Sequence, residues 1–322
     1  MGPIQTVSAY LMRACVALAI VANAAAADDV MSERSDVARK SEWSVDQIAL
    51  EFNSPFSRLS SFSWDYEYRT YQGELPGAGE QTGIKNLFTT SWPIRLRNGK
   101  NLLIRAMLPH YGNQPGWQPN IWVEYSESTI RQVPSFNEET EGFVTGHDHL
   151  GDFAFDISYG SVTENGLISS FGIASVSNTS EDGSAKRNSW LMGPQVALGQ
   201  FTDWGLIGMR ATHLTDIYGD GPEALPGMHT NETTLELFFS YAYANGWQIE
   251  SKPTILYDWE AVSGNNWSVP ISAGLSRTFL AGRMPMRLAF DLQHFVLSPD
   301  RFGPEWLFRF SLAAAFSRYA PM

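Results

Sequence analysis

Apolar and polar residues alternate along much of this chain. Between residues 61 and 69, every second position is aromatic and each position between is polar. A similar alternation runs through residues 247–259, 285–296 and 306–316. Because neighbouring side chains on a strand point to opposite faces, each segment predicts a strand with one apolar face and one polar face.

Twelve such segments follow one another along the chain. They cover approximately residues 58–71, 83–97, 101–109, 148–159, 165–176, 188–200, 203–214, 230–243, 247–259, 266–280, 284–297 and 304–318. Most of them reach the ~9–11 residues that a tilted membrane-crossing strand needs. The seventh segment is ambiguous, because Leu206, Ile207 and Met209 do not fall on one set of alternate positions.

The connections between these segments alternate between long and short. Asn98-Gly99-Lys100 and Ala244-Asn245-Gly246 are tight turns, whereas residues 110–147 form a very long connection. Outer-membrane barrels have short periplasmic turns and longer outer loops, and an even strand count brings both ends to the periplasmic side. We therefore predict an all-β fold, a closed antiparallel transmembrane β-barrel of about 12 strands over residues 58–319. A soluble β-sandwich is the alternative, but it does not need this alternation of loop length.

Aromatic residues stand near the ends of the predicted strands. The four tryptophans that we expect at the membrane interfaces are Trp247, Trp259, Trp267 and Trp306. Barrels carry aromatic girdles at both interfaces, where an amphipathic ring is best accommodated. The general preference of aromatic residues for strands is the other explanation for their positions.

Residues 1–27 have the pattern of an export signal. Arg13 is followed by an apolar run and then by small residues that end at Ala27. We expect cleavage near Ala27 and export to the outer membrane of a Gram-negative bacterium. A membrane anchor is the alternative, but the apolar run is shorter than the ~20 residues of a spanning helix. No later segment has the ~18 consecutive apolar residues of such a helix.

Residues 28–57 form a predicted N-terminal lead-in with a short helix. Over 44–52, Ser44 and Gln47 have the spacing of a capping box, and Val45, Ile48 and Phe52 fall on one helical face. Such a helix could plug the lumen or lie beneath the barrel. A periplasmic lead-in is the simpler interpretation.

Composition narrows the possible functions. The chain has 322 residues, of which 43% are hydrophobic and 17% charged, with 34 acidic and 22 basic residues. A net charge of −12 argues against a nucleic-acid partner, which usually requires a clustered basic face. Cys15 is the only cysteine and lies within the predicted signal, so neither a disulfide nor a cysteine zinc site is expected.

Charged residues on the polar face of the predicted strands are the candidates for the barrel lumen. They are Glu67, Arg69, Arg95, Arg105, Glu236, Glu250, Lys252, Asp258, Arg287, Asp291 and Arg309. A barrel of a dozen strands is wider than one of about eight, whose side chains fill it. Such a lumen can be a narrow polar channel or a packed network of ion pairs, and a mixture of signs is expected in either case.

The sequence contains no convincing catalytic, metal or cofactor site. His147 and His149 share one strand face, but Asp152 lies on the other, which is a poor ligand geometry. Outer-membrane phospholipases place histidine and serine two residues apart on one strand, but Val296 follows His294 at that spacing. No G-x-S-x-G motif is present either. We expect no enzyme activity, no cofactor and no bound metal.

Several motifs in the C-terminal half resemble one family of bacterial outer-membrane proteins. The matching residues include Gly246-Trp247, Asp258-Trp259-Glu260-Ala261, Gly264-Asn265-Asn266-Trp267, Gly282-Arg283-Met284-Pro285 and Gly303-Pro304 with Trp306 and Arg309. The family is described as MetA-pathway phenol-degradation proteins, and also as neuromedin-U-like or transporter proteins. The resemblance covers most of residues 50–318 and departs from the family pattern at Asp258, where asparagine is frequent.

The resemblance implies an outer-membrane barrel that passes small, hydrophobic or aromatic compounds. We therefore expect a passive channel or transporter for small solutes. A structural or surface-interaction barrel is the alternative, and an outer-membrane hydrolase is a third possibility. The expected partners are outer-membrane lipid, lipopolysaccharide, the barrel assembly machinery and a small-molecule solute.

Overall fold

The protein is described by a computed structural model, which covers residues 43–118, 121–124, 133–136, 142–180, 189–219, 230–261 and 264–316. The predicted signal peptide and the lead-in up to residue 42 lie outside the described residues. The elements are α2 (Val45–Asn53), β1 (Ser61–Gln72), η1 (Ala78–Glu80), β2 (Thr82–Arg95), β3 (Asn101–Gln118), β4 (Ile121–Glu124), β5 (Val133–Phe136), β6 (Gly142–Leu150), β7 (Ala154–Val162), β8 (Leu167–Val176), β9 (Ser189–Thr202), β10 (Gly205–Gly219), β11 (Asn231–Ala244), β12 (Trp247–Ser251), β13 (Thr254–Asp258), β14 (Trp267–Ala281), β15 (Met284–Leu297) and β16 (Gly303–Ala315).

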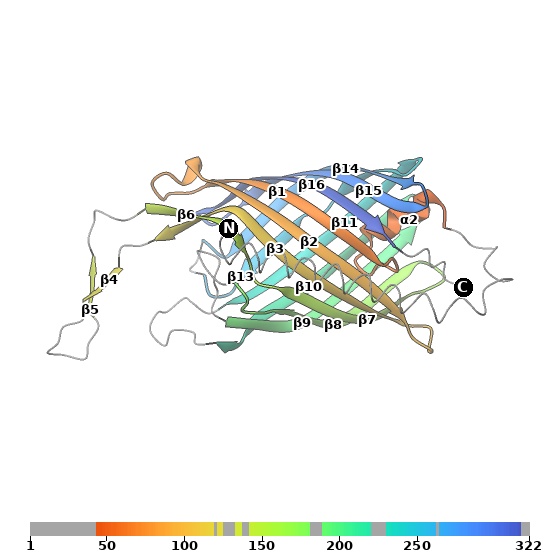
Figure 1. Ribbon diagram of the computed structural model, residues 1–322, viewed down its shortest axis with the longest axis horizontal. Coiled ribbons are helices and arrows are strands. Elements are labelled where there is room, and N and C mark those ends of the chain that lie inside the picture. Colours follow the sequence, from red (N-terminus) through yellow and green to blue (C-terminus); the bar gives the residue numbers. More distant parts are fainter. Residues whose placement is uncertain are drawn as a thin grey trace, which may run out of the picture. The chain divides into compact units, whose positions relative to one another are not determined.

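The strands form a closed antiparallel barrel, as predicted (Figure 1). Each crossing of the barrel wall pairs with the next along the chain, and β1 pairs with β16 to close the cylinder; β4 and β5 form a separate two-stranded sheet. β6 and β7 both pair with β3, and β12 and β13 both lie between β11 and β14. Each of these two sets is one crossing with a short break, which gives the predicted twelve crossings.

The predicted long connection at 110–147 is partly structured. β3 continues to Gln118 and β6 begins at Gly142, and the β4–β5 hairpin lies between them. The tight turns come at the other end of the barrel. In one of them, Asn245 and Gly246 have φ values of 52° and 79°, the left-handed conformation of a two-residue hairpin turn.

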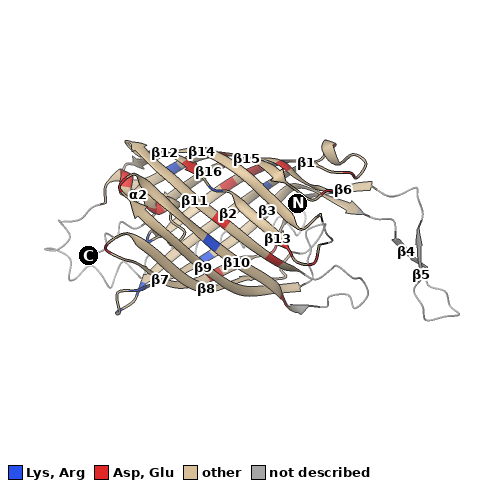
Figure 2. Cartoon of the chain, turned by 180° about the vertical axis from the view of Figure 1, so that it is seen from behind, with Lys and Arg blue, Asp and Glu red and all other residues tan. Residues whose placement is uncertain are grey.

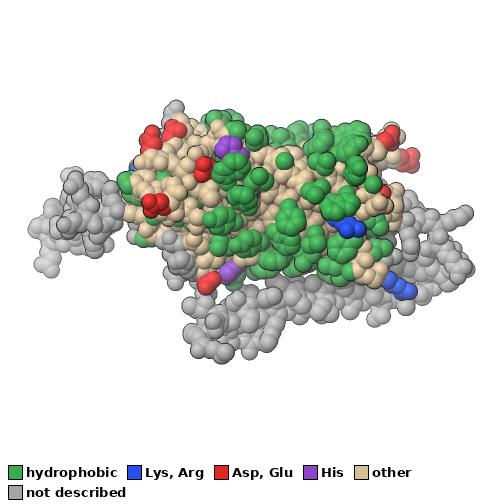
Figure 3. All heavy atoms as spheres, turned by 90° about the horizontal axis from the view of Figure 1, so that it is seen from above, with side chains coloured by type: hydrophobic (Ala, Val, Ile, Leu, Met, Phe, Trp, Pro, Cys, Tyr) green, Lys and Arg blue, Asp and Glu red, His purple; other side chains and the backbone are tan. Residues whose placement is uncertain are grey.

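The outer face of the barrel is apolar. Phe171, Ile271 and Phe290 are 63%, 60% and 62% exposed, respectively. Figure 3 shows hydrophobic side chains over the middle of the visible barrel face, with most charged side chains nearer its ends. This band is the surface that an outer-membrane barrel presents to lipid. Among the described residues, no helix is long and apolar enough to span a membrane.

Helix α2 begins as the sequence predicts. The Ser44 hydroxyl accepts from the Gln47 backbone amide, and the Gln47 side chain accepts from the Ser44 amide, which completes the capping box. The helix contacts β10, β11, β12, β14 and β15. Its buried residues Ile48 and Ala49 therefore face the inner wall of the barrel, which differs from a lead-in lying beneath it.

Candidate functional site: the barrel lumen and its plug

Residues 43–60 form a plug segment inside one end of the barrel. Phe56 is 1% exposed and packs in one apolar cluster with Leu103 on β3, Ile168 on β8 and Leu206 on β10. These wall residues point inward, although they are apolar. This placement explains why the seventh predicted strand was ambiguous, since Leu206 faces the plug while Ile207 faces outward.

A polar anchor also holds the plug. The Asn53 amide nitrogen donates to Ser240 Oγ at 3.1 Å and to Gln248 Oε1 at 2.7 Å. Lys252 Nζ donates to the Asn53 amide oxygen at 2.5 Å. At the start of the helix, the Gly246 backbone amide donates to Asp46 Oδ1 at 2.7 Å. The plug is therefore bonded to the β11–β12 part of the wall by both side-chain and backbone groups.

A buried ion pair stabilises the turn that follows the helix. The Arg58 backbone amide and Nε each donate to the Glu51 carboxylate at 2.8 Å, and the two side chains form an ion pair. The Arg58 guanidinium also lies 5.0 Å from the Trp43 ring centroid. Burial raises the pKa of the Glu51 carboxyl by more than the neighbouring Arg58 lowers it.

Three charge networks line the wall beyond the plug, and Figure 2 shows basic and acidic residues distributed along the barrel strands. The first, the Glu67 network, comprises Glu67, Arg69, Lys85, Asp291 and Arg309. Glu67 lies directly opposite Lys85 on β2 and Arg309 on β16, with ion-pair distances of 2.9 and 3.0 Å. Arg309 lies in turn opposite Asp291 on β15, at 3.7 Å. The register therefore aligns alternating charges across four neighbouring strands.

The second, the Glu250 network, comprises Glu250, Lys252 and Arg287. Arg287 Nη2 donates to both Glu250 oxygens, at 2.6 and 2.5 Å, and Lys252 Nζ lies 3.6 Å from Glu250 Oε2. The Glu250 side chain reaches past Gly274 on β14, where a Cβ atom would lie only 3.1 Å from Glu250 Cγ. Glycine at that position leaves the carboxylate room to cross the intervening strand.

The third, the Arg105 network, comprises Arg105, Asp156, Arg210 and Glu236. Arg105 donates to both oxygens of Asp156, its cross-strand partner on β7, at 3.1 and 2.6 Å. Arg210 on β10 similarly donates to Glu236, its partner on β11. Gln195 and Thr212 extend this network, since Thr212 Oγ1 donates to Gln195 Oε1.

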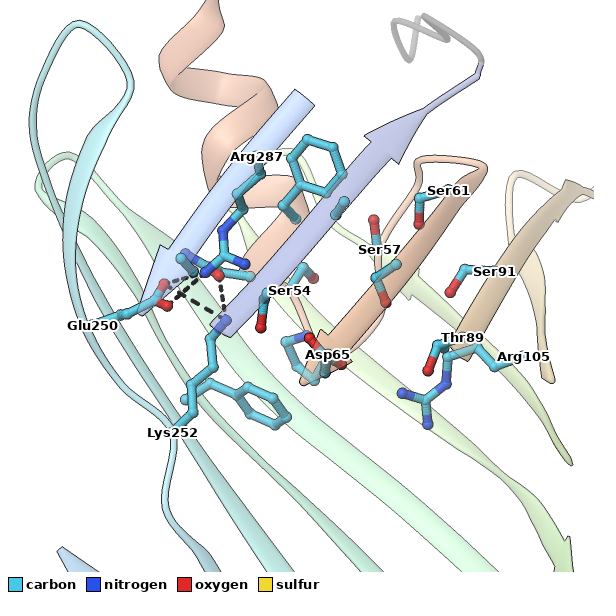
Figure 4. A pocket seen from close by; sticks show the side chains of 18 of the residues that line it. Ser54, Ser57, Ser61, Asp65, Thr89, Ser91, Arg105, Glu250, Lys252 and Arg287 are labelled. Carbon is cyan, nitrogen blue, oxygen red and sulfur yellow. Dashed lines mark hydrogen bonds and ion pairs between the residues drawn. The ribbon is translucent and has the colours of Figure 1, made fainter. Parts of the chain in front are cut away.

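A cavity of about 220 Å³ lies between the plug and these networks (Figure 4). Phe52, Asn53, Ser54, Pro55 and Ser57 line it from the plug. The charged residues that line it from the wall are Asp65, Arg105, Arg210, Glu250, Lys252, Arg287, Asp291 and Arg309. The lumen at this level is therefore a polar chamber, closed on one side by the N-terminal segment.

The structure brings together nine of the eleven residues predicted for the lumen. They are Glu67, Arg69, Asp291 and Arg309 in the first network, Glu250, Lys252 and Arg287 in the second, and Arg105 and Glu236 in the third. Arg95 lies apart from them at the end of β2, and Asp258 lies at the end of β13, where its side chain accepts from the Glu260 amide.

Sequence reasoning missed two parts of this site. Arg210 was not predicted, because Leu206 obscured the alternation of its strand. Asn53 was not predicted either, because it closes a helix in a segment interpreted as a lead-in. The local sequence Asn53-Ser54-Pro55 indicates only that a helix ends there. It does not show that Asn53 hydrogen-bonds Ser240 and Gln248 on distant strands.

The predicted interface tryptophans lie near strand ends on the outer surface. Trp247 is exposed beside the tight turn at Asn245, and the Arg277 guanidinium lies 5.2 Å from its ring centroid. Trp259 and Trp267 are exposed at the opposite end, and Trp306 packs against the His294 ring at a centroid distance of 4.3 Å. Their role as membrane anchors stays a prediction.

Within the described ranges, no group of three or more His, Cys, Asp or Glu residues could hold a metal ion. The side chain of His147 lies outside the described residues. Asp152 Oδ1 accepts from the backbone amides of Thr179 and Ser180 at 2.9 and 2.8 Å, which closes the turn after β8.

No family model matches the sequence, and no curated protein matches it. The resemblance to the phenol-degradation family therefore stays a prediction.

Among solved structures, the chain is similar to an outer membrane channel from Pseudomonas putida F1, with a TM-score of 0.57 and 9% identity over 82% of this chain and 98% of that one. It is also similar to the NanC porin, with a TM-score of 0.45 and 10% identity over 79% and 99% of the two chains. A Pseudomonas aeruginosa FadL homologue gives a TM-score of 0.39, with 11% identity over 84% of this chain and 94% of that one. The chain thus has the twelve-stranded barrel fold of Gram-negative outer-membrane proteins.

Proposed function

We propose that this protein is an outer-membrane channel through which small solutes pass by diffusion. The observation that carries the proposal is the charged cavity inside a closed barrel whose outer face is apolar. A barrel of this strand number is too wide for wall side chains alone to fill, so its interior has room for a solute. The plug segment occupies part of the lumen and so narrows the channel when no solute is passing.

The resemblance to the phenol-degradation family suggests that the solutes are small, hydrophobic or aromatic compounds. The fold shared with the outer membrane channel from Pseudomonas putida F1 is compatible with this function. The partners in this proposal are outer-membrane lipid and lipopolysaccharide at the apolar band, the barrel assembly machinery during insertion, and the solute in the lumen.

A structural barrel is the second candidate, because the lumen charges are extensively paired. Glu67 and Glu250 each contact more than one cation, and Asn53 joins the plug to Lys252. A lumen that is held permanently closed by such pairs would stabilise the barrel without passing solute.

Planar-bilayer recording separates the two functions. We expect the mature protein to give steady ohmic conductance steps, and a variant lacking residues 28–56 to give larger ones. A heat-modifiable shift on a gel checks that both forms are folded barrels. Silence of both folded forms would refute the channel and favour the structural barrel.

A further inference from the structure

The chamber presents more positive than negative charge to a solute. Five cationic side chains and three carboxylates line the cavity. Asp156 and Glu236, which pair with Arg105 and Arg210, are not among its lining residues, and neither is Glu67, the nearer of the two partners of Arg309; the other partner, Asp291, does line the cavity. Arg105 and Arg210 therefore face the cavity, while their partners form part of the wall.

Side-chain exposure shows the same asymmetry. In seven of the eight ion pairs between described lumen residues, the cation is more exposed than the carboxylate. Arg105 is 14% exposed against 1% for Asp156, and Lys252 is 23% exposed against 2% for Glu250. The three networks contain seven cations and five carboxylates, and the charged groups that a solute meets in the cavity are mainly cations.

One of these donors has no partner in the described part of the chain. Arg287 is 5% exposed and lines the cavity, and its Nε has no hydrogen-bond acceptor, although its Nη2 is bonded to Glu250. A buried donor without an acceptor carries a free-energy cost that an added acceptor would remove. An anion in the chamber would provide such an acceptor.

The apolar part of the chamber limits the kind of anion. Phe52 from the plug and Phe238 from β11 line the cavity, and Phe238 lies 5.6 Å from the Arg210 guanidinium. A volume of about 220 Å³ is below the ~300–1,000 Å³ of pockets for drug-sized ligands. The chamber therefore suits a small solute with one anionic group and a compact apolar or aromatic body.

From this geometry we infer that the chamber is a binding site for small organic monoanions, with aromatic carboxylates as the best-fitting class. The inference rests on the proposed channel function and adds the charge and shape of its solute. Arg105 and Arg210 on one wall and Arg287 and Lys252 on the other receive the carboxylate. Phe52 and Phe238 contact the ring. Basic linings of this kind select anions in other pores.

Benzoate is the probe, and benzamide is its uncharged control. We expect calorimetric titration of the mature protein in detergent to show benzoate binding and no benzamide binding. In planar bilayers, we expect the reversal potential across a KCl gradient to show chloride preference, and benzoate to reduce the chloride current. Calorimetry does not require an open channel, so it tests the site independently of conduction.

The decisive variant is Arg105→Gln combined with Asp156→Asn. It removes one cavity cation together with its wall partner, so no buried carboxylate is left unpaired. Benzoate affinity should fall about tenfold or more, since a hydrogen bond to a charged group is lost. Arg277→Gln is the matched control, because Arg277 lies over Trp247 on the outer face and should leave the affinity unchanged.

The outcomes separate the two proposals. Benzoate binding without conductance would support the site and refute the channel. Conductance with cation preference and no benzoate binding would refute the site and leave the channel. Equal benzoate affinity in the double variant and the wild type would also refute the assigned position of the site.

Discussion

Replacement of Phe56 by alanine should release the plug. Phe56 is 1% exposed and contacts residues on three strands, β3, β8 and β10. Truncation of a buried phenylalanine costs roughly 3–5 kcal/mol, because transfer and cavity terms add. If that cost falls on docking, the docking equilibrium constant drops by roughly 10²–10⁴-fold. The barrel itself should remain folded, because its strand pairing does not involve Phe56.

Cysteine accessibility measures this release. The predicted mature chain has no cysteine, so Ala49→Cys introduces a single one at a helix position that is 0% exposed. A charged maleimide should label it slowly in the parent and much faster with Phe56→Ala, because labelling follows the population of the released plug. Single-channel steps should become larger or more frequent in parallel.

Phe171→Ala is the matched control, since Phe171 is 63% exposed on the outer face. It makes the same chemical change away from the plug and should leave the labelling rate unchanged. An unchanged labelling rate in a folded Phe56→Ala barrel would refute the reasoning, because the apolar cluster would then contribute little to docking.

Three other perturbations test the wall and the plug. Gly246→Val should sharply lower the yield of folded barrel on a heat-modifiability gel, because φ is +79° and its Cβ would lie 2.1 Å from the Thr278 carbonyl oxygen. Burial raises the pKa of Glu51 above its usual 4.5, so the docked plug binds a proton more tightly than the released plug. Docking should therefore weaken as pH rises through that raised pKa, so the rate of cysteine labelling should rise more in the parent than in Glu51→Gln over the same pH range. Arg105→Gln alone should destabilise the barrel to denaturant by roughly 3–5 kcal/mol, because Asp156 stays buried without its partner, and adding Asp156→Asn should restore most of the loss. Equal stability of the single and double variants would contradict that account.

The strand pattern was predictable because a barrel wall imposes it on the sequence. Lipid on one side and a polar lumen on the other require alternation, so the twelve crossings and the tight turn at Gly246 could be identified. The capping box at Ser44 and Gln47 was predictable for a similar reason, since it depends on residues three apart. β3 extends to Gln118, well beyond its predicted end. Outside the membrane neither face of a strand contacts lipid, so its residues do not need to alternate between apolar and polar, and the pattern no longer reveals the strand.

The sequence by itself thus determined the fold class, the faces of most strands and the start of the helix, since these depend on near neighbours. Only the tertiary structure decided where the helix lies, because Phe56 and Asn53 bind wall residues far away in the chain. The tertiary structure also decided which charges pair, because register brings Arg105 opposite Asp156 and Gly274 lets Glu250 reach Arg287. Leu206 illustrates the physical reason. A residue type on a strand matches whatever its side chain faces, and the inward-facing Leu206 contacts the apolar plug residue Phe56 rather than a polar lumen. The sequence alone does not show that contact, because the plug and the strand are far apart in the chain.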